Sequence, residues 1–413
     1  MKGEKLMKGI IKKYTETSLI IRILIGLIIG AVLGLACPNL TGFAIPGDIF
    51  VGALKAIAPV LVAVLVCSSV AKAGEGIGSR FKTVIILYMA TTLIASTFAV
   101  FSAKLFPVKL KLVAAATDVT PPDGLAGIFK NLLTGMVQNP IKAVAEANYL
   151  AILFWAIVIG LALKLLGSKA TVDVIATLSE ALSKVVGWVI QFAPFGVMGI
   201  MFTNISTNGL VVFIDYGKLI LLLVGTMLFT SLVINPILVA VLLKKNPYPL
   251  VFKCIKTSGV PAFFTRSSAA NIPVNMALCE ELGLDKDFYS VSIPLGSTIN
   301  MDGAASVITI MSLTAANTLG INVPLPLAIV LSIVATLGAC GASGVAGGSL
   351  LLIPMACSLL GIGQDVAMQV VAVGFIIGVI QDSVETALNS SGDVIFTATA
   401  EFYERAKKEK AAK

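Results

Sequence analysis

The stretch GSTINMDGAA, residues 296–305, interrupts an apolar segment of the chain. Ile293 precedes it, and Ile308 and Ile310 follow it, so the flanking sequence has the composition of a membrane span. A charged side chain at the centre of a bilayer costs at least about 2.5 kcal/mol. We therefore expect Asp302 to have a partner inside the protein that compensates its charge.

The composition of the chain is that of a membrane protein. Of its 413 residues, 57% are hydrophobic and only 13% are charged, whereas soluble domains have about 25% charged residues. The first apolar segment, residues 18–37, is long enough to span a bilayer core of about 30 Å and longer than the apolar core of a secretory signal. We predict an all-α polytopic membrane protein whose first span is this segment.

The residue types of the chain exclude several functions. His is absent from the sequence, which removes Ser-His-Asp catalysis and most transition-metal sites. The six Cys form no C-x-x-C pair and are interpreted as small buried apolar residues. A channel or a membrane enzyme remains an alternative, although the sequence has neither a selectivity-filter motif nor a phosphate-binding loop. The net charge of +8 is accompanied by no nucleic-acid-binding signature.

Basic residues lie beside the apolar spans. Lys and Arg are concentrated in residues 1–13 and 403–413, and the positive-inside rule then predicts that both termini are cytoplasmic. An even number of crossings follows. In the first part of the chain, full spans are predicted at 18–37, 47–72, 82–106, 149–166, 184–205 and 216–243.

In the second half of the chain the apolar runs are short and broken by small and polar residues. The breaks are FFTRSSAANIP at 263–273 and LGACGASGVAGGS at 337–349, and each lies between apolar arms of about 12 residues, half a membrane thickness. Paired interrupted segments are typical of transporter binding sites. We predict two re-entrant hairpins that alternate with spans at 287–314 and 365–400 as inverted repeats. Close helix packing also uses Gly and Ser, but it requires neither an Arg nor a helix-breaking NMDG.

The last span carries IQDSVETALNSSGD at residues 380–393. The polar residues on one helix face, at i, i+4, i+7 and i+11, together with an adjacent acid, are Asp382, Thr386, Asn389, Asp393 and Glu385. Acids inside a membrane are functional by default. With Asn300 and Asp302, this face supplies the oxygen ligands that a hard monovalent cation prefers. We predict a Na⁺ site and a transporter in which entering Na⁺ drives a solute.

These motifs resemble those of the dicarboxylate/amino acid:cation symporters, a family with the glutamate transporter fold. They are TRSSAANIPV in the first hairpin, NMDG, the Gly-rich second tip, the terminal D-x-x-x-T-x-x-N-x-x-x-D, and YMATT upstream. The resemblance extends over nearly the whole chain. It implies eight transmembrane helices plus two re-entrant hairpins in the inner membrane of a bacterium. It also implies an elevator-type homotrimer, in which a transport domain moves across the bilayer against a fixed scaffold.

The resemblance further implies a division of the chain. The scaffold would comprise residues 1–79, with helices 1 and 2, and residues 107–206, with an extracellular excursion and helices 4 and 5. The transport domain would comprise helix 3 at 80–106, helix 6 at 207–249, hairpin 1 at 250–285, helix 7 with the NMDG break at 286–318, hairpin 2 at 319–362, and helix 8 with the basic tail at 363–413.

Three kinds of Na⁺ site are implied by the resemblance, with Na⁺ as the coupling ion and no transition metal. The first would use Tyr88, Thr91, Thr92, Asn300 and Asp302. The second would use carbonyls of Gly296, Asn300 and Asn389 with the carboxylate of Asp393. The third would use backbone oxygens of Thr298, Ala339, Cys340 and Ala342.

The implied substrate site is built around the last span. Asp382 would bind the substrate ammonium and pair with Arg266. Asn389, with Ser268 and the hairpin backbone, would bind the α-carboxylate. The other implied substrate contacts are Ser267, Ser383, Glu385, Thr386, Val345 and Gly347.

One departure from the family pattern concerns the substrate. Members that carry acidic amino acids have an Arg three residues after the ammonium-binding Asp, and Glu385 occupies that place here. An ionised Glu would repel a side-chain carboxylate by about 3 kcal/mol at ~5 Å and an effective dielectric constant of ~20. The neighbouring hydroxyls of Ser383 and Thr386 suit a small hydroxylated amino acid. Ala346 also replaces a Pro that many relatives have.

The pattern most resembles the bacterial sodium-dependent serine/threonine symporters within that family. The predicted function is sodium-coupled uptake of L-serine and L-threonine, with the bilayer and the amino acid as partners and no nucleic acid. The alternative is a sodium- or proton-coupled symporter of dicarboxylates, acidic amino acids or other neutral amino acids. Uptake measured at fixed pH with and without Na⁺ distinguishes the two drivers.

Overall fold

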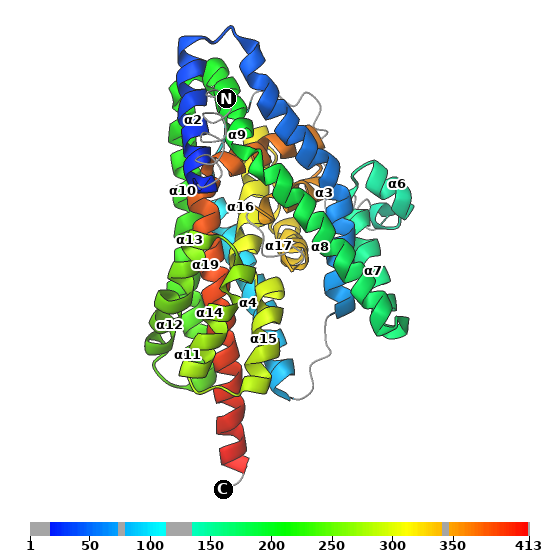
Figure 1. The fold of residues 1–413 in the computed structure, drawn as a ribbon, viewed down its shortest axis with the longest axis vertical. Helices are drawn as coiled ribbons and strands as arrows, with labels where there is room; N and C mark the ends of the chain where they lie inside the picture. Colours follow the sequence, from blue (N-terminus) through cyan, green and yellow to red (C-terminus); the bar gives the residue numbers. More distant parts are fainter. Residues whose placement is uncertain (1–16, 73–78, 113–133, 341–346, 412–413) are drawn as a thin grey trace, which may run out of the picture.

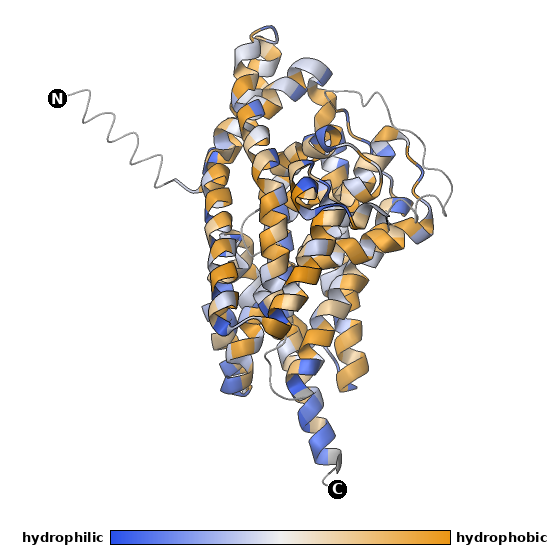
Figure 2. Cartoon of the chain, turned by 90° about the vertical axis from the view of Figure 1, so that its right-hand side faces the viewer, coloured by the Kyte–Doolittle hydropathy of each residue, from blue (hydrophilic) through white to orange (hydrophobic). Residues whose placement is uncertain are grey.

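The computed structural model describes residues 17–72, 79–112, 134–340 and 347–411, and the regular structure within these ranges is helical. The longest helix, α19 (Gln364–Ala411), runs down the molecule in Figure 1, and its C-terminal end projects beyond the other helices. Figure 2 shows that this projecting end is hydrophilic, whereas hydrophobic residues cover much of the other helices. This distribution of hydrophilic and hydrophobic residues is expected if the C-terminal end of α19 lies outside the membrane.

Six helical segments in the described ranges are long and apolar enough to cross a membrane. They are Leu19–Ala36, Thr41–Lys72, Arg80–Leu105, Ala193–Leu243, Lys286–Leu319 and Gln364–Glu409. Apolar side chains of the first segment face outward, since Ile21, Ile25 and Ile28 are each at least 50% exposed. By contrast, the polar residues of the last two segments are largely buried. The chain is therefore a membrane protein with apolar surfaces and polar groups in its interior.

Four of the predicted spans are present as helices. They are α2 (Leu19–Ala36), α3 (Ile45–Lys72), α4 (Ser79–Leu105) and α7 (Tyr149–Leu166). A polar residue begins two of them, because Ser18 accepts a hydrogen bond from the Ile21 amide and Asn148 accepts one from the Ala151 amide. Short helices η1 (Thr41–Ala44) and α6 (Pro140–Ala145) precede α3 and α7.

The span predicted at 184–205 is wrong, because the structure divides this region into two helices. α8 (Lys169–Gln191) ends before Phe192, and α9 (Ala193–Asn208) begins after it. Pro194 lies in the first turn of α9, where its missing N–H costs no helical hydrogen bond. The apolar run continues across this boundary, so hydrophobicity alone did not reveal the break.

The span predicted at 216–243 is present, with an irregularity in its middle. After η2 (Gly209–Val211), α10 (Val212–Phe229) leads through the π-helical turn η3 (Thr230–Ile234) into α11 (Asn235–Leu243). This turn does not end the helix, because α11 continues directly from it. One extra residue is accommodated in it, which changes the direction of the side chains that follow.

Two helix–turn–helix elements occupy the regions predicted as hairpins. In the first, α12 (Tyr248–Cys254), η4 (Ile255–Gly259) and α13 (Val260–Thr265) form one arm, and α14 (Ser268–Glu281) forms the other. The second consists of α17 (Leu325–Ala339) and, beyond the undescribed residues 341–346, η5 (Ser349–Leu352) and α18 (Ile353–Leu359).

The helix break predicted at NMDG is confirmed. α15 (Lys286–Ile299) ends before Asn300, and α16 (Asp302–Leu319) begins after Met301, whose backbone is not helical (φ −123°, ψ 47°). α16 then runs through the centre of the molecule, packed against α4, α17 and α19. The break therefore lies beside the polar face of α19.

Polar contacts join α4, α15 and α19 at one end of these helices. Arg80 of α4 donates to Asp285, which caps α15, over 2.7 Å, and this hydrogen bond lowers the pKa of Asp285 below its ordinary value. The Asp285 amide donates in turn to Glu401 of α19, at 3.0 and 3.1 Å. Glu401 also pairs with Arg405 on its own helix. These contacts fix α4, α15 and α19 relative to one another.

Candidate functional site

Arg266 and Asp382 form a buried ion pair at the turn of the first hairpin. Nε of Arg266 lies 2.6 Å from Oδ2 of Asp382, and the two side chains are only 9% and 4% exposed. Arg266 has a positive φ of 53°, which ends α13 and turns the chain towards α14. The backbone amide of Gly347 donates to Oδ1 of Asp382 over 3.2 Å. Both hairpins therefore meet α19 at this carboxylate, and the pairing expected for Arg266 is present.

The serines of the first turn have different positions. Ser267 caps α14 by accepting a hydrogen bond from the Ala270 amide. Ser268, the first residue of that helix, is buried. Ser267 directly follows Arg266 in the chain, and Ser268 is the next residue. Both serines therefore belong to the turn whose Arg266 pairs with Asp382 of α19.

The hydroxyls of Ser383 and Thr386 bond to their own helix. Ser383 donates to the Val379 carbonyl over 2.8 Å, and Thr386 donates to the Asp382 carbonyl over 2.7 Å. Each hydroxyl oxygen keeps acceptor capacity when its proton is used in this way. These residues can therefore accept a hydrogen bond from a bound hydroxyl group.

Glu385 is held by two residues that the sequence interpretation did not include. Its Oε2 accepts from Ser349 Oγ of η5 over 2.8 Å and from Gln381 Nε2 over 2.5 Å. Both partners are almost fully buried. Gln381 lies one helical turn before Glu385, so its contact was recognisable from spacing, whereas the contact of Ser349 depends on the tertiary fold.

Glycine is required where α16 passes Glu385. A Cβ atom on Gly303 would lie 2.9 Å from the Cα atom of Glu385, a backbone position that a side chain could not displace. The Gly303 amide donates to Oδ1 of Asn389 over 2.8 Å. The NMDG glycine thus lets the start of α16 approach the polar face of α19 closely.

Asn300, Asn389 and Asp393 form a buried hydrogen-bonded cluster. Nδ2 of Asn300 donates to Oδ1 of Asp393 over 3.0 Å and to the Asn389 carbonyl over 3.1 Å. Gly296 is also close, because a Cβ atom there would lie 2.9 Å from Oδ1 of Asp393. The residues predicted for the second Na⁺ site are therefore neighbours. Oδ2 of Asp393 is buried and has no hydrogen-bond partner among the described residues.

Residues of α4 approach the same break in the helix. Thr92 Oγ1 donates to Oδ1 of Asp302 over 3.1 Å, and Thr91 Oγ1 lies 3.5 Å from Oδ1 of Asn300. The Tyr88 hydroxyl lies 3.1 Å from the Asp393 carbonyl. All of the residues predicted for the first Na⁺ site are therefore close together.

Asp302 has one contact that the sequence interpretation missed. Nδ2 of Asn235, from α11, donates to Oδ2 of Asp302 over 3.1 Å. Asn235 is fully buried. It stands alone in the apolar run LVINPIL, residues 232–238, and that isolation was the available signal.

The charge of this cluster favours a cation. Asp302 and Asp393 are fully buried, and in the part of the chain that the structure describes no Lys or Arg forms an ion pair with either. A buried carboxylate without a counter-charge is costly. Carboxylate, amide, hydroxyl and carbonyl oxygens surround the two acids, and these are the ligands of hard cations.

The residues predicted for the third Na⁺ site are only partly described. Sγ of Cys340 lies 3.6 Å from the Ile299 carbonyl, which places the end of α17 beside the end of α15. Ala339 is buried, whereas Thr298 is exposed and donates to the Leu295 carbonyl. Ala342 and Val345 lie outside the described residues, as does Ala346.

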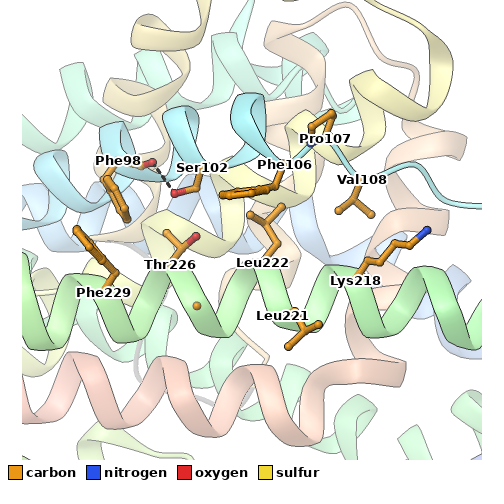
Figure 3. Close-up of a pocket in the computed structure, with 11 residues that line it drawn as sticks. Phe98, Ser102, Phe106, Pro107, Val108, Lys218, Leu221, Leu222, Thr226 and Phe229 are labelled. Carbon is orange, nitrogen blue, oxygen red and sulfur yellow. Dashed lines mark hydrogen bonds between the residues drawn. The ribbon is translucent and has the colours of Figure 1, made fainter.

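A cavity of about 590 Å³ lies away from these residues, between α4 and α10. In Figure 3 the rings of Phe98 and Phe229 face each other at one end, and Lys218 lies towards the other. Its lining is mostly apolar and includes none of the predicted ligands. This cavity therefore does not have the character of an amino-acid or cation site.

Known proteins are similar to this chain over nearly its full length. A serine/threonine transporter SstT of Bifidobacterium adolescentis is 58% identical over 402 residues, which are 97% of this chain and 94% of that protein. Serine/threonine transporters SstT of Streptococcus thermophilus and Streptococcus agalactiae are each 57% identical over 96% of this chain and 98% of their own. Residues 19–401 match the sodium:dicarboxylate symporter family. The match covers most of the chain and includes every residue of the buried polar cluster, so the protein belongs to the sodium:dicarboxylate symporter family.

Proposed function

We propose that the protein is a sodium-coupled symporter that takes up L-serine and L-threonine. The observation that carries this function is the pair of buried carboxylates, Asp302 and Asp393, which oxygen donors surround and no basic residue of the described chain neutralises. The identity of 57% and 58% to proteins named serine/threonine transporters supports the substrate. The protein is a transporter and not an enzyme.

Na⁺ is the coupling ion in this proposal, and three groups of residues bind it. The first is Tyr88, Thr91, Thr92, Asn300 and Asp302. The second comprises the carbonyls of Gly296, Asn300 and Asn389 with the carboxylate of Asp393. The third comprises backbone oxygens of Thr298, Ala339, Cys340 and Ala342. Their positions around the NMDG break support the first two groups, since unwound backbone frees carbonyl oxygens there.

The substrate binds between the two hairpins and α19. Its ammonium group takes the place of the Gly347 amide at Asp382, while Arg266 holds the other carboxylate oxygen. Its α-carboxylate accepts from Nδ2 of Asn389, because among the described residues this NH₂ group donates only to the weak acceptor Sδ of Met301. Ser268 and the hairpin backbone complete the carboxylate site.

The substrate side chain lies towards Glu385. Ser383 and Thr386 offer acceptor oxygens to its hydroxyl group, because their own protons bond to the helix backbone. Ser267, Val345 and Gly347 close the site from the two hairpins. An acidic side chain would meet Glu385 in this position, so a small neutral hydroxylated amino acid is preferred.

The proposed membrane arrangement has eight transmembrane helices and two re-entrant hairpins. Ala193–Leu243 has 51 residues, about 76 Å at 1.5 Å per residue, which is enough for two crossings of a ~30 Å core. The scaffold and transport domains divide the chain as the sequence predicts. A homotrimer works as an elevator in the bacterial inner membrane, with both termini in the cytoplasm.

Sodium entry can concentrate a neutral amino acid strongly. One Na⁺ that moves through ~100 mV releases about 2.3 kcal/mol, and each tenfold Na⁺ gradient adds about 1.4 kcal/mol. The sum corresponds to an accumulation of roughly several hundredfold with a single ion. Because the amino acid is a zwitterion, each cycle carries net positive charge inward.

The purified protein in proteoliposomes is expected to accumulate labelled serine against its gradient when Na⁺ is high outside. An inside-negative potential should accelerate uptake, because the transported complex is positively charged. Uptake is measured at one pH with Na⁺ or K⁺ outside, and empty liposomes are the control. Equal uptake in K⁺ medium would exclude sodium coupling, and uptake driven only by a pH gradient would identify a proton symporter.

Glu385 is expected to exclude acidic substrates. Labelled serine uptake is measured with excess aspartate in the wild type, Glu385→Gln and Glu385→Arg. Aspartate should inhibit little in the wild type, more in Glu385→Gln, and most in Glu385→Arg, where a cation attracts the carboxylate. Glu401→Gln, which changes another buried acid of α19, is the control. Equal inhibition in all folded variants would show that Glu385 does not face the substrate.

A further inference from the structure

Asn235 is the one side-chain amide in α10, η3 and α11, residues 212–243, and it lies in the apolar run 232–238. It is fully buried. An amide in apolar surroundings costs free energy unless its donors and acceptors are paired. Neither the proposed substrate contacts nor the proposed sodium ligands include this residue, so its position requires another explanation.

The backbone before Asn235 turns it towards the polar interior. The π-helical turn η3 (Thr230–Ile234) immediately precedes it, and Pro236 follows it. Such turns are rare and occur frequently at functional sites. The extra residue rotates the following side chains by about 100° around the helix relative to a regular α-helix. Here the result is that Asn235 faces α16.

The carboxylate of Asp302 is fixed by two donors from two helices. Nδ2 of Asn235 donates to Oδ2 over 3.1 Å, and Thr92 donates to Oδ1 over the same distance. Because an ionised carboxylate only accepts hydrogen bonds, the NH₂ group of Asn235 must face it. The orientation of Asp302 is thus determined from both sides.

The oxygen end of the amide has no hydrogen-bond partner in the part of the chain that the structure describes. Oδ1 of Asn235 is buried and accepts no hydrogen bond from the described residues. It belongs to the same amide as the Nδ2 that contacts Asp302, so it lies close to that carboxylate. Amide oxygens are ligands of hard cations. A second orphaned oxygen, Oδ2 of Asp393, lies in the same buried cluster.

We propose that Asn235 is a further residue of the sodium site at Asp302. Its NH₂ group positions the carboxylate, and its Oδ1 supplies an additional oxygen to the ion. This inference rests on the proposed sodium coupling and adds to it a residue of α11. It also gives the π-helical turn a function, which is to aim this amide at the site.

The test measures sodium binding without transport. The purified protein is unfolded thermally without amino acid at rising NaCl, with choline chloride keeping the ionic strength constant. An ion that binds only the folded state stabilises it by RT ln(1 + [Na⁺]/Kd), so the melting temperature rises once the Na⁺ concentration exceeds Kd. We expect Asn235→Leu to need about tenfold more Na⁺ than the wild type for the same rise in melting temperature, which corresponds to about 1.4 kcal/mol.

The control is Asn204→Leu, which removes another buried Asn whose Nδ2 bonds to the Ile200 carbonyl of its own helix. This variant should unfold at a lower temperature but respond to the same Na⁺ concentrations as the wild type. If Asn235→Leu needs only the wild-type Na⁺ concentration for the same rise in melting temperature, the inference is overturned. If Asn235→Leu does not fold, Asn235→Ser must show the raised Na⁺ requirement, and failure of both to fold would assign Asn235 to core structure alone. A wild type that does not respond to Na⁺ would contradict the proposed function instead.

Discussion

Asp393→Asn is expected to weaken the activation of serine uptake by Na⁺ strongly while the protein still folds. The substitution removes the negative charge but keeps an oxygen that can accept the hydrogen bond from Asn300. Asp302→Asn should act in the same direction, because its neighbours Thr92 and Asn235 lose a carboxylate partner. Each loss of a buried charge contact is worth about 3 kcal/mol, so the Na⁺ concentration for half-maximal uptake should rise about 100-fold or more.

Uptake is measured over a range of Na⁺ concentrations at constant ionic strength, after the amount of folded protein in each variant has been determined. Glu401→Gln is the matched control, because Glu401 is also a fully buried acid of α19 but pairs with Arg405. It should leave the Na⁺ dependence unchanged. Wild-type Na⁺ dependence in both Asp variants would assign the two acids a structural role.

Polar residues inside apolar runs were the most reliable signal in the sequence. The cost of burying NMDG in a membrane predicted a break with a function there, and the structure places the break at Asn300 and Met301. The same reasoning identified the acids of α19 as functional. The helical spacing also predicted that Asn389 and Asp393 share one face of that helix. These features could be predicted because each is unfavourable unless another part of the protein compensates it.

Other features depend on tertiary contacts that no local pattern contains. Ser349 lies in a Gly-rich segment and gains its importance only because η5 approaches Glu385. The π-helical turn before Asn235 likewise has no distinct local sequence. Hydrophobicity also placed one span across the junction of α8 and α9, although Pro194 was a signal for the start of a helix.

The ion pair of Arg266 and Asp382 has a role in stability and a proposed role in substrate binding. The melting temperature measures the first role, and serine uptake measures the second. Asp382→Asn should destabilise the protein by about 3–5 kcal/mol, since it leaves the buried guanidinium without a counter-charge. Serine uptake should be lost, because the proposed partner of the substrate ammonium is removed as well. The melting temperature and the uptake rate are measured on the same preparation.

The double variant Arg266→Met with Asp382→Leu removes both charges together. Replacement of a buried ion pair by apolar residues of similar volume is often neutral for stability, so the melting temperature should recover most of the loss. Uptake should remain absent, because no carboxylate is left for the ammonium group. Arg266→Met alone should have a lowered melting temperature. In that case the recovery of stability in the double variant results from removing both charges together. A double variant that transports serine like the wild type would mean that Asp382 serves only to neutralise Arg266, and the proposed ammonium site would have to lie elsewhere.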